Sequence, residues 1–68
     1  MSAMIRINGR EENVTAATVA ELLQVRGIEG RRGVAVAVNG AVVPVGAWRE
    51  RALVAGDEVE IVRPFGGG

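Results

Sequence analysis

The chain has 68 residues, 49% of them hydrophobic, and its eight arginines balance eight acidic residues to give no net charge. A neutral chain has no global attraction to nucleic acid or to anionic membranes. Cysteine and histidine are absent, which excludes disulfides, iron–sulfur ligation, the usual structural zinc sites and the commonest catalytic base. We therefore expect one small domain with an aliphatic core, monomeric when free and without a bound cofactor or metal. Because no signal-peptide pattern or apolar run of roughly 20 residues is present, we expect a cytoplasmic protein.

The first predicted element is a β-hairpin. Residues 4–8 (MIRIN) alternate in the period-two manner of a half-buried strand. Asn8-Gly9 is a strong hairpin signal, because both residues tolerate the positive φ of a tight turn. Residues 11–15 form the expected returning strand, with Val14 as its core contact.

A short helix is expected next, because residues 18–21 (TVAE) match a capping box. In that motif the Thr18 hydroxyl accepts from the Glu21 backbone N–H, and the Glu21 side chain reaches back to Thr18. The apolar side chains on one helical face are Val19, Leu22 and Leu23. Gly27 is placed to end the helix in a left-handed conformation, with Ile28 closing the cap against Leu23.

A second hairpin follows a glycine-rich loop. Residues 34–39 (VAVAVN) predict a strand with its three valines on one face, and Asn39-Gly40 repeats the turn signal. Residues 41–43 return as a strand, and Pro44 ends the pairing because it has no N–H to donate.

The last third of the chain predicts an irregular crossover and one more strand. Residues 46–51 form the crossover, with Trp48 covering the edge of the core rather than binding a ligand. Residues 55–57 (AGD) predict a turn, and residues 58–63 (EVEIVR) a final strand.

This order of elements predicts an α+β, ubiquitin-like β-grasp fold, with a mixed sheet of four to five strands packed on one helix. The last strand is expected beside the first, in parallel. We expect a domain over residues 1–63 and a flexible tail over residues 64–68. The residues assigned by alternation to the open face of the sheet are Arg6, Ala35, Ala37, Glu58, Glu60 and Val62.

The side-chain inventory favours chemistry at the tail over an enzyme active site. Glu58 and Glu60 share an open face, where nothing desolvates them enough to separate their pKa values for acid–base work. Beyond Pro64 the chain ends in three glycines, which can thread a channel too narrow for other residues. Five residues extend at most roughly 17 Å. At the tip, the Gly68 carboxylate needs activation before it can be transferred.

These segments resemble the ThiS-type ubiquitin-like sulfur carriers of thiamine thiazole synthesis, a group related to MoaD. The resemblance covers nearly the whole chain, and order, spacing and the terminal diglycine carry it together. The matching pieces are IRING at 5–9, TVAELL at 18–23, VAVAVNGAVVP at 34–44, Trp48, LVAGDEVEIV at 53–62 and Gly67-Gly68.

The resemblance implies a carrier that is a protein co-substrate and not an enzyme. A ThiF-like adenylating enzyme would use ATP to convert the Gly68 carboxylate into an acyl-adenylate. A sulfur donor such as a cysteine desulfurase would then yield a thiocarboxylate, which a ThiG-like thiazole synthase would consume. Gly67 and Gly68 form the functional tip, and Pro64, Phe65 and Gly66 lead into it.

Partners are expected to grip the tail and the open sheet face beside it. Val62 and Phe65 are the predicted apolar anchors, with Arg6 and Arg63 at the rim.

Other functions stay open at this point. The Arg63-Pro64-Phe65 sequence is similar to the tails of MoaD-like carriers for molybdopterin synthesis. A ubiquitin-like modifier would conjugate through the same tail. A β-grasp interaction module without covalent chemistry would not need the tail at all.

Overall fold

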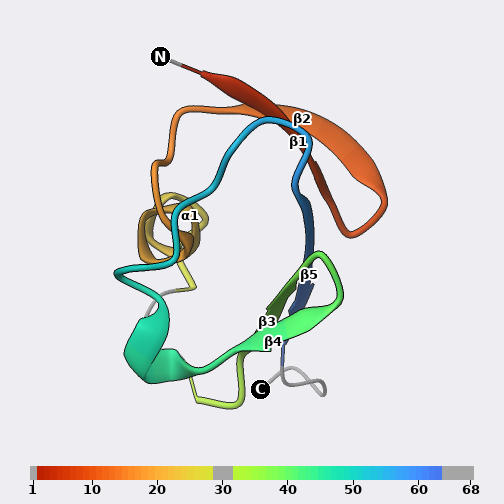
Figure 1. Ribbon diagram of the computed structural model, residues 1–68. Coiled ribbons are helices and arrows are strands. Elements are labelled where there is room, and N and C mark those ends of the chain that lie inside the picture. The colour runs from red at the N-terminus through yellow and green to blue at the C-terminus, as the bar shows by residue number, and fades with distance from the viewer. Residues whose placement is uncertain (1, 29–31, 64–68) are drawn as a thin grey trace.

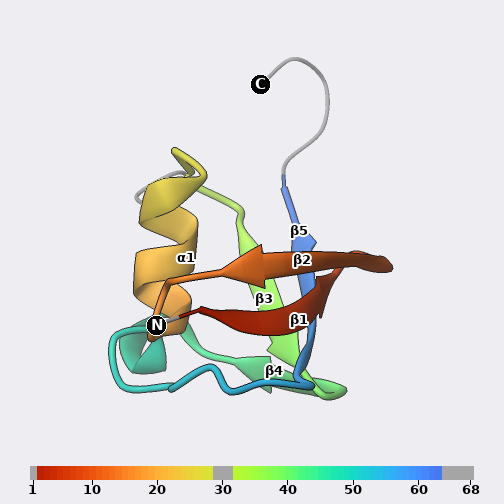
Figure 2. The same ribbon diagram turned by 90° about the horizontal axis from the view of Figure 1, so that it is seen from above.

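A five-stranded mixed sheet packs one of its faces against a seven-residue helix (Figures 1 and 2). The computed structural model describes residues 2–28 and 32–63. The elements are β1 (Ala3–Ile7), β2 (Arg10–Val14), α1 (Val19–Val25), β3 (Ala35–Val38), β4 (Ala41–Val43), the 3₁₀ helix η1 (Val45–Ala47) and β5 (Glu58–Val62). No helix in the described ranges has the length and apolar character to cross a membrane.

The strand order is β2-β1-β5-β3-β4, so the last strand lies at the centre of the sheet. β5 runs parallel to β1 and antiparallel to β3, and each hairpin pairs its own two strands antiparallel. The predicted β-grasp fold and the parallel pairing of the first and last strands are confirmed.

Both Asn-Gly turns adopt the predicted positive φ values, 50° and 84° at Asn8 and Gly9, and 53° and 85° at Asn39 and Gly40. The strands flanking the first turn are each displaced by one residue from the prediction. Asn8 leaves the extended region, so β1 ends at Ile7, and a two-residue turn makes Arg10 its direct partner. The same effect ends β3 at Val38, before Asn39.

The predicted helix caps are largely confirmed. Thr18 Oγ1 accepts from the Glu21 N–H at 3.2 Å, and the Ile28 N–H donates to the Leu23 carbonyl at 3.0 Å. The Glu21 side chain, however, accepts from the Ala17 N–H at 2.8 Å, so its predicted reach to Thr18 is wrong. An antiparallel bridge between Thr18 and Ala52 holds the chain extended here, which presents the Ala17 N–H to the first helical turn.

The core fills the space between α1 and the covered sheet face. Its buried side chains are Ile5, Ile7, Val19, Leu22, Leu23, Ile28, Val34, Val36, Val38, Val43, Trp48, Leu53, Val59 and Ile61. Trp48 is buried as predicted, and its indole N–H donates to the Val43 carbonyl at 2.9 Å. Val14 packs against the core from β2.

Candidate functional site

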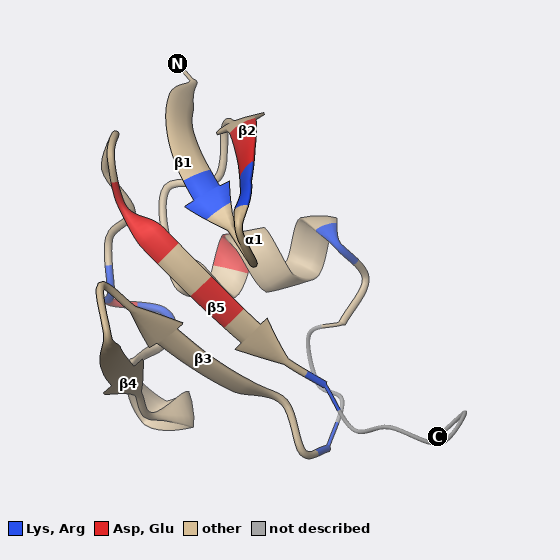
Figure 3. Ribbon diagram, turned by 90° about the vertical axis from the view of Figure 1, so that its right-hand side faces the viewer, with Lys and Arg blue, Asp and Glu red and all other residues tan. Residues whose placement is uncertain are grey.

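The sheet presents its other face to solvent, as Figure 3 shows with the strands in front of α1. Alternation along the strands assigned six side chains to this face, and five of them are exposed while Ala37 is half-buried. Those five are Arg6, Ala35, Glu58, Glu60 and Val62. The open face is therefore confirmed as a polar and apolar surface without a covering element among the described residues.

The predicted tail begins where β5 ends. Pro64, Phe65, Gly66, Gly67 and Gly68 lie outside the described residues. Val62, the last residue of β5, is 62% exposed. The exposed Arg63 follows it and lines a pocket of about 110 Å³ together with Asn8 and Arg26. The structure therefore places two predicted partner-binding residues, Val62 and Arg63, directly before the tail.

Small apolar side chains continue from Val62 across the sheet. Val62 pairs with Ala35 on β3, and Ala37, two residues further along β3, pairs with Val42 on β4. We call these four residues the apolar strip. Val42 is 76% exposed and was missing from the predicted set. Its place could have been found from the sequence, since it alternates with Val43 in a strand that follows a two-residue turn.

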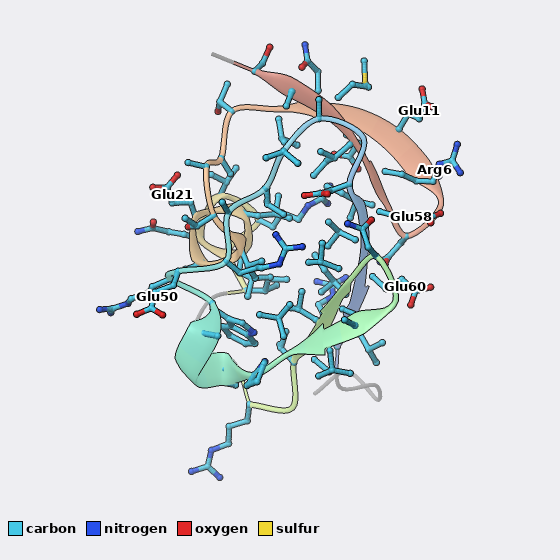
Figure 4. The ribbon with its side chains drawn as sticks, viewed as in Figure 1. Arg6, Glu11, Glu21, Glu50, Glu58 and Glu60 are labelled. Atoms are coloured by element: carbon cyan, nitrogen blue, oxygen red, sulfur yellow. The ribbon has the colours of Figure 1, made fainter. Side chains whose placement is uncertain are left out.

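Charged side chains occupy the other end of the open face (Figure 4). The guanidinium of Arg6 lies 3.6 Å from a carboxylate oxygen of Glu11 and 3.6 Å from one of Glu58. The three side chains are between 49% and 66% exposed, and ion pairs between such exposed groups contribute little to stability. Glu60 lies between this cluster and the apolar strip, and it forms no ion pair with the basic residues of the described ranges.

Arg6 is not close to Val62 and Arg63, the residues that precede the tail. It pairs with Glu58 at the start of β5, and Val62 lies four residues further along. At roughly 3.3 Å per residue this separates the two positions by about 13 Å. Val62 and Arg63 therefore lie together, whereas Arg6 lies between Glu11 and Glu58. We call these two glutamates around Arg6 the acidic cluster.

The turn before β5 contains a buried carboxylate. Asp57 is 5% exposed, and its two oxygens accept from the Val54 N–H and the Asn39 side-chain amide, both at 2.9 Å. The sequence predicted the turn but not this role, because the Asn39 partner comes from a distant hairpin. No cluster of three metal-ligating side chains exists within residues 2–28 and 32–63.

The comparisons with known proteins agree with this architecture. A family model described as the ThiS family matches residues 5–68. The chain belongs to the ThiS family. A crystal structure of the thiamine biosynthesis protein ThiS from Geobacter metallireducens superposes with a TM-score of 0.77 at 31% identity, covering 96% of this chain and 99% of that chain.

An NMR solution structure of a thiamine biosynthesis protein from the same organism gives the same TM-score, 0.77, and the same identity, 31%. It covers 96% of this chain and 87% of that chain. No curated protein matches the chain. Family and fold together identify a thiamine-related sulfur carrier of the ThiS type.

Proposed function

We propose that this ThiS family member carries sulfur to thiazole synthesis as a thiocarboxylate on Gly68. The observation that carries the proposal is the family match, which continues past β5 to residue 68. The position of β5 supports it, because the tail follows a central strand that pairs with β3 as far as Val62. Both similar structures are of thiamine biosynthesis proteins, which favours the thiazole branch over a MoaD-like role.

The proposed chemistry first activates the Gly68 carboxylate, then loads sulfur onto it, and finally delivers that sulfur. A ThiF-like enzyme joins the Gly68 carboxylate oxygen to the α-phosphorus of ATP, and pyrophosphate leaves. A cysteine desulfurase supplies the sulfur as a protein persulfide, whose terminal sulfur attacks the acyl carbon while AMP leaves with the bond pair. A thiol then attacks the inner sulfur of the resulting acyl disulfide, which releases the thiocarboxylate and leaves a disulfide. The resulting thiocarboxylate gives its sulfur to a ThiG-like thiazole synthase. In this scheme the carrier itself binds no cofactor, and the partner binds the ATP. Because the reaction uses ATP, we propose that it takes place in the cytoplasm.

We further propose that the partner covers the apolar strip and grips the tail. Val62 is the described anchor, and Phe65 is the second one within the tail. Glu60 is exposed beside Ala37 of the strip and forms no ion pair with a basic residue of the described ranges, so an arginine or lysine of the partner fits there.

The experiment combines the carrier with purified ThiF-like enzyme, ATP, a cysteine desulfurase with cysteine, and a thiol reductant, and then measures the intact mass of the carrier. We expect the mass change of one oxygen replaced by sulfur, and thiazole formation when the ThiG-like synthase is added. Gly67→Ala should lower adenylation at least about tenfold, because a side chain next to the reacting carboxylate misplaces it.

Gly46→Ala is the matched control, since Gly46 has no positive φ and a Cβ there meets nothing within 4 Å. Equal adenylation of the two alanine variants would contradict the tail assignment. A thiocarboxylate that serves molybdopterin synthase but not thiazole synthase would move the chain to the MoaD-like branch. A mass increase equal to a whole second protein would indicate a modifier.

A further inference from the structure

The parallel pairing of β1 and β5 ends before β5 does. Its last backbone bond joins the Asn8 N–H to the Val59 carbonyl at 2.9 Å. The chain then turns at Asn8-Gly9, and Arg10 pairs back with Ile7 in the first hairpin. β5 continues to Val62, so the N–H and C=O of Ile61, which point to the β1 side as those of Val59 do, meet no backbone of β1.

The side chain of Asn8 supplies the missing partner. Its Oδ1 accepts from the Ile61 N–H at 2.8 Å, and its Nδ2 donates to the Ile61 carbonyl at 3.2 Å. A carboxamide carries an acceptor and donors like a peptide unit, so it can take the place of one. Asn8 therefore adds one more pair between β1 and β5, near the C-terminal end of β5.

The second hairpin repeats this device at the other end of β5. Asn39 has nearly the same φ as Asn8, 53° against 50°. Its Oδ1 accepts from the Glu58 N–H at 2.9 Å, and its Nδ2 donates to Asp57. One asparagine thus holds the start of β5 and the other holds its end.

We propose that Asn8 is a positioning residue for the chemistry at the C-terminus, an inference that rests on the proposed function. By pairing Ile61 on the side opposite β3, Asn8 keeps the end of β5 from rotating about its β3 edge. It thereby orients Arg63, the last described residue before the tail. Ala35, Ala37 and Val42 of the apolar strip belong to β3 and β4 and stay in place without Asn8, so we expect most of the docking surface to be kept.

The test compares Asn8→Gly with Asn39→Gly, because glycine accepts the positive φ of both turns and removes only the carboxamide. ATP–pyrophosphate exchange by the ThiF-like enzyme is measured against carrier concentration. We expect Asn8→Gly to lower kcat about tenfold with KM within about twofold, as for a misplaced reactant. Asn39→Gly should leave both constants within about twofold of the wild type, when all three proteins are fully folded.

Two further measurements separate positioning from stability. Amide hydrogen exchange at Ile61 should accelerate in Asn8→Gly but not in Asn39→Gly. Aspartate also tolerates the positive φ of the turn, and its carboxylate keeps the acceptor for the Ile61 N–H but has no donor for the Ile61 carbonyl. Asn8→Asp should therefore not restore kcat.

A wild-type kcat in Asn8→Gly, or an equal loss in both glycine variants, would overturn the inference. A wild-type carrier that supports no exchange at all would instead overturn the proposed function, and the kinetic claim with it. If the hydrogen exchange of the Ile61 amide were unchanged in Asn8→Gly, the proposed effect of Asn8 on the end of β5 would be contradicted, whatever the kinetic result.

Discussion

At the scale of single residues, Asp57 shows how one carboxylate can organise the approach to the central strand. Its oxygens bind the Val54 N–H three residues back and the side-chain amide of Asn39, while its own carbonyl accepts from the Arg6 N–H at 3.0 Å. One buried residue thereby joins the turn, the second hairpin and β1. A buried polar group of this kind is stabilising only while its hydrogen bonds are kept.

Replacing Asp57 by alanine should lower the free energy of unfolding by roughly 1–3 kcal/mol, because the Val54 N–H and the Asn39 amide lose their acceptor in a buried place. Urea unfolding followed by circular dichroism measures the change. Glu60→Ala removes an exposed carboxylate and should stay within about 0.5 kcal/mol of the wild type. Equal stabilities of the two variants would contradict the role given to Asp57.

At the scale of elements, α1 is too short to be stable on its own. It has seven residues, and isolated helices below roughly 12–15 residues are marginal in water. Its ends are therefore important: Thr18 satisfies an N–H at the start, and Gly27, with φ 75°, allows the Ile28 and Leu23 bond at the finish. The caps and the buried face formed by Val19, Leu22 and Leu23 hold the helix in place.

Thr18→Ala should destabilise the protein by about 1 kcal/mol, since the N-cap acceptor is lost. The melting temperature and urea midpoint report the change. Thr15→Ala makes the same chemical change at an exposed position just before the helix. A loss in Thr15→Ala as large as that in Thr18→Ala would show that the effect does not come from the cap.

The same scale shows what could be predicted from the sequence. The two Asn-Gly pairs, the capping box and the valine alternation are local signals, and each one predicted its element to within a residue or two. The second use of Asn8 was not predictable, because its partner Ile61 is 53 residues away and becomes a neighbour only through the parallel register. Asp57 was missed for the same reason.

At the scale of the whole molecule, the open face divides into two regions of different character. The apolar strip runs from the end of β5 to β4, and the acidic cluster of Glu11 and Glu58 around Arg6 lies at the start of β5 (Figures 3 and 4). This order places apolar contact area next to the tail. A partner that covers the strip would therefore lie beside Val62, two residues before the tail begins.

Val62→Asp should raise the Kd for the ThiF-like partner about tenfold or more, because a carboxylate is placed where an apolar contact is expected. Surface plasmon resonance or calorimetry measures it. Val45→Asp is the control: Val45 is 67% exposed, and it lies in η1 on the helix side of the sheet (Figure 1). If both variants bind alike, the strip is not the contact.

The parallel alignment of β1 and β5 also has a practical consequence for handling the protein. Both strands run in the same direction, so Ala3 begins β1 at the end of the sheet opposite the end that Val62 reaches (Figure 3). A fluorophore or an immobilising linker joined before Ala3 would therefore lie at the end of the sheet away from Val62 and Arg63. Single-molecule and sensor-chip experiments should therefore attach the carrier there.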